Sequence, residues 1–167
     1  IINDNNWNRP IYFGVTVSPT SMLNLDNYLQ MEGLAYRLVN NSNQIINQNK
    51  MSDNLLSYIG DNSWFTDYDS NKYNLIERNI SKEYQRGYIF RNLANEKVYV
   101  DPQLGRLVQN YRTGFVRLSI SHYLNKDFQK AEAALLKMEE IMPSSIIPIP
   151  SKQLQYQIAQ VYSGVGN

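Results

Sequence analysis

The sequence predicts an α+β protein, in which a small N-terminal part with a sheet is followed by a mostly helical C-terminal part. Ile11–Val17 alternates apolar residues with polar or small ones, as a half-buried strand does. After Asp101, apolar residues recur instead with the period of an amphipathic helix. Hydrophobic residues form 43% of the chain and charged residues 19%, which is typical of folded proteins.

The N-terminal part is predicted to be a βαβ-type unit. Ser18–Thr20 ends the first strand, and a short helix around Leu25–Met31 follows, with Asn24 as its N-cap. Gly33 ends this helix, and Leu34–Val39 has the composition of a second strand. A strand, a helix and a strand within so few residues most simply form a right-handed unit with parallel strands.

The middle of the chain is more polar. Asn40–Asp53 is rich in Asn, Gln and Ser and predicts a loop or an irregular hairpin. Asp61–Asn71 is acidic and aromatic and leads into a predicted helix near Lys72–Asn79. Asp67–Asn71 alternates oxygen-bearing side chains as a calcium loop does, but lysine and arginine stand where such a loop needs glycine and glutamate. We therefore expect a surface turn there.

The C-terminal part begins with a strong helix start. Asp101 is a predicted N-cap and Pro102 the first helical residue, and the apolar period continues to about Leu124. Asp127 begins a second helix, which ends before Pro143.

Tyr111–Pro143 has the spacing of one tetratricopeptide repeat, which is a hairpin of two helices. Leu118 falls on the large apolar position of the first helix, and Ala131 on the small position where the two helices cross. Leu135 and Met138 fall on the packing face of the second helix. A repeat of this kind buries its apolar face against a neighbour.

A further repeat is predicted after Pro143–Pro150, a stiff, extended linker. Gln153–Ser163 would be its first helix, and Tyr156 would lie on the side that a second helix normally covers. The residues on its packing side are Leu154, Ile158, Val161 and Tyr162. We expect self-association through the uncovered side.

The sequence thus divides into three predicted regions. They are the βαβ-type part at 1–60, a connecting helical or irregular region at 61–100, and the tetratricopeptide-like hairpin with the start of a further repeat at 101–167.

Composition and motifs exclude several classes of function. The net charge is +1 without clustered basic residues, so we expect no nucleic-acid partner. The chain has no cysteine, which excludes disulfides and thiolate metal sites. It has no nucleophile elbow, phosphate-binding loop, dinucleotide fingerprint or paired carboxylates, so we expect no catalytic residue, cofactor or metal. The single histidine, His122, is predicted to be a packing residue.

Two sets of residues are candidate binding surfaces. The residues of the first repeat helix that would face a groove are Thr113, Val116, Ile120, Tyr123 and Leu124. Because they are mostly apolar, the groove either packs onto the N-terminal part or accepts a partner segment. The residues of a candidate aromatic surface are Trp7, Arg9, Tyr12, Trp64, Phe65 and Tyr68. Such a surface would bind a sugar or a lipid headgroup, and the alternative is that these aromatic side chains fill the core and its rim.

Several stretches together resemble a known family. They are Asn8–Phe13, Glu32–Val39, Tyr73–Leu75, Val98–Asp101 and Tyr111–Leu118. In this order they are similar to the C-terminal, extracytoplasmic part of a bacterial family of large multi-pass membrane proteins of unknown function. The membrane half of that family resembles protein O-mannosyltransferases. The chain departs from the family pattern at Ser119 and in the Asn125–Asp127 turn, so the repeat is a divergent copy.

The resemblance implies a non-catalytic extracytoplasmic (periplasmic) tail of an inner-membrane, polyprenyl-linked glycosyltransferase. Such a tail would support the catalytic half or contact acceptor protein, and its partners would be its own membrane domain, an acceptor or another envelope protein. The alternative is a stand-alone tetratricopeptide-type interaction module of the cell envelope. No residue of this chain matches a catalytic motif of the family.

Overall fold

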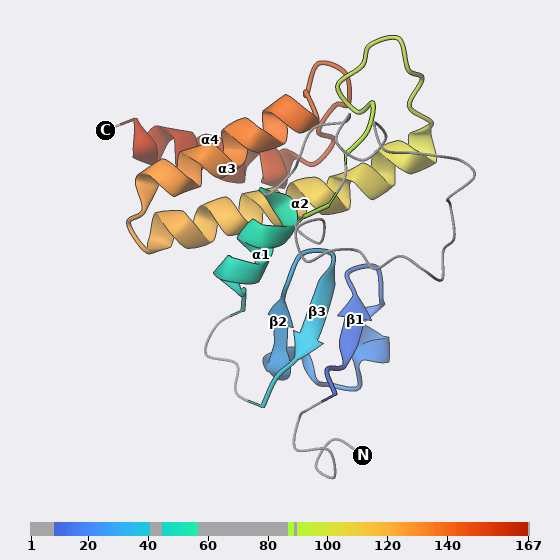
Figure 1. Ribbon diagram of the computed structural model, residues 1–167, viewed down its shortest axis with the longest axis vertical. Helices are drawn as coiled ribbons and strands as arrows, with labels where there is room; N and C mark the ends of the chain where they lie inside the picture. The colour runs from blue at the N-terminus through green and yellow to red at the C-terminus, as the bar shows by residue number, and fades with distance from the viewer. Residues whose placement is uncertain (1–8, 41–44, 57–86, 89, 167) are drawn as a thin grey trace, which may run out of the picture.

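The computed structural model describes residues 9–40, 45–56, 87–88 and 90–166. This part of the chain contains a small three-stranded sheet followed by four α-helices, which confirms the predicted α+β class. Figure 1 shows the sheet at one end of the molecule and the long helices at the other, with the first helix between them.

The sheet consists of β1 (Tyr12–Gly14), β2 (Leu29–Met31) and β3 (Ala35–Leu38). Its order is β1-β3-β2, and β3 pairs antiparallel with both neighbours. The predicted βαβ unit with parallel strands is therefore wrong. The first strand is also shorter than the predicted Ile11–Val17, since β1 ends at Gly14.

The error comes from Gly33, which was predicted to end a helix. Its φ of 110° lies in the left-handed region, and with it the chain reverses tightly from β2 into β3. The Glu32 amide donates to the Ala35 carbonyl at 2.9 Å to close this turn. The helix expected at Leu25–Met31 is replaced by a short 3₁₀ helix, Asp26–Tyr28, and the strand β2.

Helix α1 (Gln48–Leu55) lies where the sequence predicted a loop or an irregular hairpin, so that prediction is also wrong. Asn47 caps the helix by accepting a hydrogen bond from the Lys50 amide. Met51 and Leu55, one helical turn apart, are fully buried against the next helix. Burial of these two side chains outweighs the weak helix propensity of the polar residues around them.

The three remaining helices are α2 (Pro102–Leu124), α3 (Phe128–Ile141) and α4 (Lys152–Val165), close to their predicted bounds. Asp101, Asp127 and Ser151 each cap a helix through a side-chain oxygen. The linker before α4 is not extended throughout, because the Ile146 and Ile147 amides both donate to the Pro143 carbonyl.

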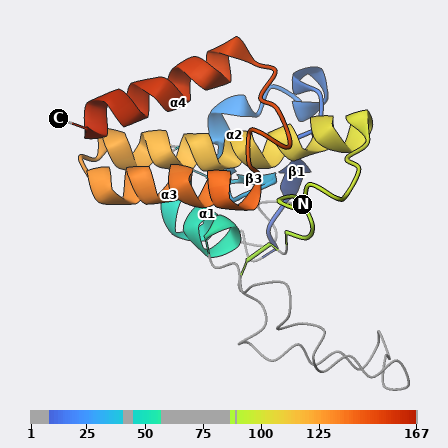
Figure 2. The same cartoon turned by 90° about the horizontal axis from the view of Figure 1, so that it is seen from above.

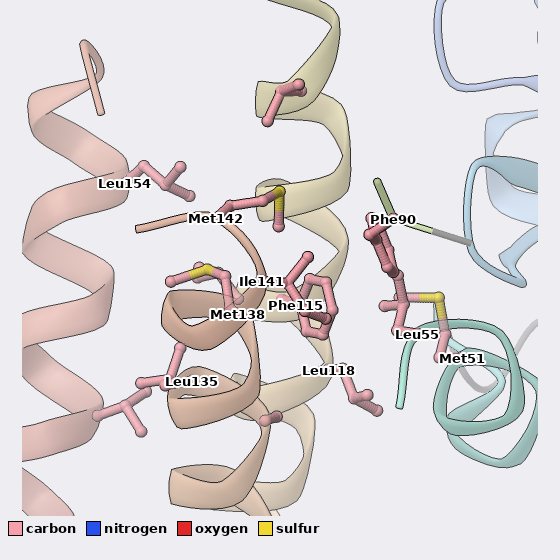
Figure 3. Close-up of a cluster of buried hydrophobic side chains, with 14 of the residues drawn as sticks. Met51, Leu55, Phe90, Phe115, Leu118, Leu135, Met138, Ile141, Met142 and Leu154 are labelled. Carbon is pink, nitrogen blue, oxygen red and sulfur yellow. The ribbon is translucent and has the colours of Figure 1, made fainter. Parts of the chain in front are cut away.

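The helices pack in layers around one continuous core. Seen from above, α2 and α3 lie side by side, α4 covers one side of the pair and α1 the other (Figure 2). Figure 3 shows core side chains from all four helices, from Leu154 on α4 to Met51 on α1. The sheet contributes Met31 to the same core.

The predicted packing of the α2–α3 hairpin is confirmed. Leu118, Ala131, Leu135 and Met138 are all buried. Ala131 lies where the two helices approach closely, since the Ser119 hydroxyl on α2 donates to the Ala131 carbonyl on α3 at 2.6 Å. On α4, Leu154 and Val161 are buried and Ile158 is partly buried as predicted, whereas Tyr162 stays exposed.

Candidate functional site

A groove runs between the C-terminal half of α2 and helix α4, with a volume of about 740 Å³. Three of the predicted groove residues, Ile120, Tyr123 and Leu124, line its α2 wall. They lie together because positions three and four apart share one face of a helix. We refer to this feature as the α2–α4 groove.

The structure places the other two predicted groove residues elsewhere. Val116 has no exposed surface and belongs to the hydrophobic core. Thr113 is partly buried, and its hydroxyl donates to the Gln109 carbonyl one turn earlier at 2.9 Å. Only the last two turns of α2 therefore contribute to the groove.

Helix α4 supplies the opposite wall, mostly through aromatic, amide and small residues. They are Tyr156, Gln157, Ala159, Gln160, Val161, Ser163 and Gly164. Gly164 admits the Tyr123 side chain, because a Cβ atom at this position would overlap the Tyr123 ring and hydroxyl. The groove thus combines an apolar floor with amide groups that can hydrogen-bond to a peptide backbone.

Most of the candidate aromatic surface lies outside the described residues, namely Trp7, Trp64, Phe65 and Tyr68, as does the acidic turn Asp67–Asn71. Arg9 is exposed. Tyr12 is also exposed, and its hydroxyl donates to a Glu32 carboxylate oxygen at 3.1 Å. Partial desolvation of the hydroxyl, followed by this hydrogen bond and the negative charge of Glu32, raises the pKa of Tyr12.

Sequence reasoning missed the buried carboxylate of Glu32. Besides Tyr12, it accepts a hydrogen bond from the Asn47 amide at 3.1 Å and forms an ion pair with Arg37 at 3.7 Å. The network ties β1, the β2–β3 turn and the start of α1 together. A signal was present, because Tyr12 belongs to the first family-like stretch and Glu32 and Arg37 belong to the second.

His122 lies in the packed interior near the start of α3, away from the groove lining. Burial lowers its pKa, and the nearby Asp127 carboxylate opposes this shift. Its Nε2 atom has no hydrogen-bond partner.

Within the described residues, no group of three or more His, Asp or Glu side chains could hold a metal ion. None of the described helices is long and apolar enough to cross a membrane.

Residues 1–56 match the family model of TMEM260-associated domain 2. This family is tied to TMEM260, a membrane protein that resembles protein O-mannosyltransferases. No curated protein and no solved structure matches the chain.

The matched region contains the whole sheet and α1. Its hydrophobic residues Met31, Met51 and Leu55 belong to the same core as α2, α3 and α4. The region that matches the family model is therefore joined to the helical part through a shared interior.

Proposed function

We propose that the chain is a non-catalytic, extracytoplasmic part of a membrane-embedded protein that resembles glycosyltransferases. There it supports the catalytic half or contacts acceptor protein. The match of residues 1–56 to the TMEM260-associated family carries the proposal. The order of the other family-like stretches along the chain, from Tyr73–Leu75 to Tyr111–Leu118, supports it.

The shared core supports a role for the whole chain rather than for its N-terminal part alone. Met51 and Leu55 on α1 pack against α2 beside Gly114. The two helices are close there, since a Cβ atom at Gly114 would be in van der Waals contact with Leu55 Cδ1 at 3.4 Å. The helices are thus positioned by the family-related part, and the α2–α4 groove has a fixed place relative to the sheet.

The alternative is a stand-alone tetratricopeptide-type interaction module. It is favoured by the position of α4, which packs on both α2 and α3, as the first helix of a following repeat packs on the preceding hairpin. In both functions the α2–α4 groove would bind protein. They differ in whether the chain belongs to a membrane-embedded protein. The gene upstream of Ile1 separates them, because about ten apolar spans would support the membrane protein and a lone signal peptide the module.

A labelling experiment tests the extracytoplasmic location directly. These 167 residues contain no cysteine, so in a full-length protein whose other cysteines are replaced by serine a single introduced thiol reports on its own position. Tyr99 is 81% exposed, and we expect Tyr99→Cys in the full-length membrane protein to react with a membrane-impermeant maleimide in intact cells. Ser119→Cys is the matched control, because Ser119 is fully buried and should react only after denaturation. Labelling of Tyr99→Cys only after the membrane is permeabilised would contradict the proposal.

A further inference from the structure

A second hollow lies beside the α2–α4 groove, with a volume of about 520 Å³. Its lining residues are Ile45, Ile46, Gln48, Arg117, Ile120, Ser121, Leu124 and Asn125. Ile120 and Leu124 line both features, so these two side chains form a ridge of α2 between them. We call the second feature the Arg117 hollow.

Four of the eight described residues that line the Arg117 hollow are aliphatic. Ile45 is 74% exposed and Leu124 is 73% exposed, although both are large apolar side chains. They stand on opposite elements, since Ile45 precedes α1 and Leu124 ends α2. A ligand lying between them would remove apolar surface from water on both sides.

Arg117 provides the charge of the hollow. Its Nη1 atom donates to the Tyr36 hydroxyl at 2.9 Å and approaches the Met31 sulfur at 3.5 Å. Both partners are neutral, and in the described part of the chain no carboxylate lies within ion-pair distance of Arg117. A second edge of the planar guanidinium, with its own N–H groups, can bind a carboxylate through two parallel hydrogen bonds.

The remaining polar groups are amides and a hydroxyl. The Gln48 side-chain amide donates to the Ser121 hydroxyl at 2.7 Å, which links α1 to α2 across the hollow. Asn125 lies at the end of α2. Side-chain amides can both donate to and accept from the peptide groups of an extended segment.

We propose that the Arg117 hollow binds a polypeptide segment in which an acidic side chain lies next to apolar ones. The carboxylate pairs with Arg117, and the apolar side chains cover Ile45, Ile120 and Leu124. The hollow continues over the Ile120–Leu124 ridge into the α2–α4 groove, whose α4 wall carries further amides. A polypeptide matches this alternation of aliphatic and amide groups over two adjoining hollows better than a single small amphiphile does.

The inference rests on the proposed protein-binding role and names the chemistry of the partner. The inference does not depend on the extracytoplasmic location, so an experiment can refute the inference or the location separately. Loss of peptide binding with Tyr99→Cys still labelled in intact cells would refute only the inference.

The test is selection of a random 12-residue peptide display library on the immobilised 167-residue chain, followed by fluorescence anisotropy with the selected peptides. We expect enrichment of peptides with Asp or Glu flanked by apolar residues. Replacing that acidic residue by its amide should weaken binding at least about tenfold, as should Arg117→Gln. Selected peptides without an acidic residue, or equal binding by Arg117→Gln, would overturn the inference.

Arg117→Gln also removes the hydrogen bond from Arg117 to Tyr36 on β3, so a second pair of variants leaves this bond intact. Ile45→Glu places a negative charge on the rim of the hollow, and we expect it to abolish binding of the acidic peptides. Leu23→Glu is the matched control, since Leu23 is also 74% exposed and lies outside the lining of the hollow. Equal loss of peptide binding in both variants would show that the effect is non-specific and would overturn the inference.

Two lipid probes test the other class of ligand. Binding of sodium decanoate or anionic lipid vesicles without peptide binding would assign the hollow to a lipid and also overturn the inference.

Discussion

Arg112 shows how one buried charge organises the C-terminal part. Its side chain is fully buried, and burial lowers its pKa while the Glu139 carboxylate opposes the shift. The guanidinium donates to the Met142 carbonyl at 2.7 Å and to the Pro148 carbonyl at 3.1 Å. It thereby fixes both ends of the α3–α4 linker to α2, while its Nε atom has no partner.

Replacing this arginine should therefore loosen the linker. We expect Arg112→Met to lower the free energy of unfolding by on the order of 3 kcal/mol, because two buried carbonyls lose charge-assisted hydrogen bonds. Arg106→Met, on the exposed face of the same helix, should change it by less than about 0.5 kcal/mol. Urea unfolding of both variants measures the difference. An unchanged midpoint for Arg112→Met would mean that the linker holds its position without the guanidinium.

The buried side chain of His122 should make the stability of the protein depend on pH. Its pKa in the folded protein is lowered, so the unfolded chain binds the proton more readily. The stabilising contribution of the neutral form is complete above the unfolded pKa of about 6.5 and is lost as the pH falls below it. We expect the wild-type protein to lose more stability between pH 7 and pH 5 than His122→Phe. Parallel stability–pH curves for the two proteins would contradict a buried, neutral histidine.

At the scale of the elements, the crossing of α2 and α3 offers a matched pair of substitutions. Ala131 is fully buried at this crossing, whereas Ala133 is exposed on the same helix. We expect Ala131→Leu to destabilise the protein by about 1–3 kcal/mol, because a larger side chain must push the helices apart. Ala133→Leu should remain within about 0.5 kcal/mol of the wild type. Thermal melting compares them, and equal melting temperatures would show that the helices do not meet closely at Ala131.

The sequence predicted the helices far better than the sheet. α2, α3 and α4 carry a long apolar period and capping residues such as Asp101 and Ser151, so their signals are local. The strands have three or four residues, too few to show their direction. Gly33 is compatible with both a helix end and a hairpin turn, and only the pairing with β1 and β2 decides between them.

Helix α1 and the Arg117 hollow escaped prediction for a related reason. The helix is stabilised by contacts of Met51 and Leu55 with α2, which is distant in sequence. Of the five residues expected to face a groove, Ile120, Tyr123 and Leu124 line the α2–α4 groove, and their role in binding stays a prediction. The Arg117 hollow was not predicted, because Ile45 and Gln48 reach it only through the tertiary packing of α1 on α2.

At the scale of the whole molecule, the side of α4 that carries Tyr156 is a candidate surface for association between copies of the chain. Tyr156 is 64% exposed on this helix, and Leu124 lies across the groove from it. Exposed apolar side chains on adjoining elements favour association, since contact with another copy removes them from water. We propose that the isolated chain associates weakly through this surface, which a partner protein would otherwise cover.

Light scattering over a range of concentrations tests this proposal. We expect the mean mass of the wild-type chain to rise with concentration, and Tyr156→Lys to hold it near the monomer mass of 19.4 kDa. Leu107→Lys is the matched control, because Leu107 is 54% exposed on α2 and outside the groove lining, so this variant should associate like the wild type. A wild-type chain that stays monomeric at high concentration would show that α4 closes the helical part by itself. The groove would then be a site for a specific partner rather than an apolar surface that drives association between copies of the chain.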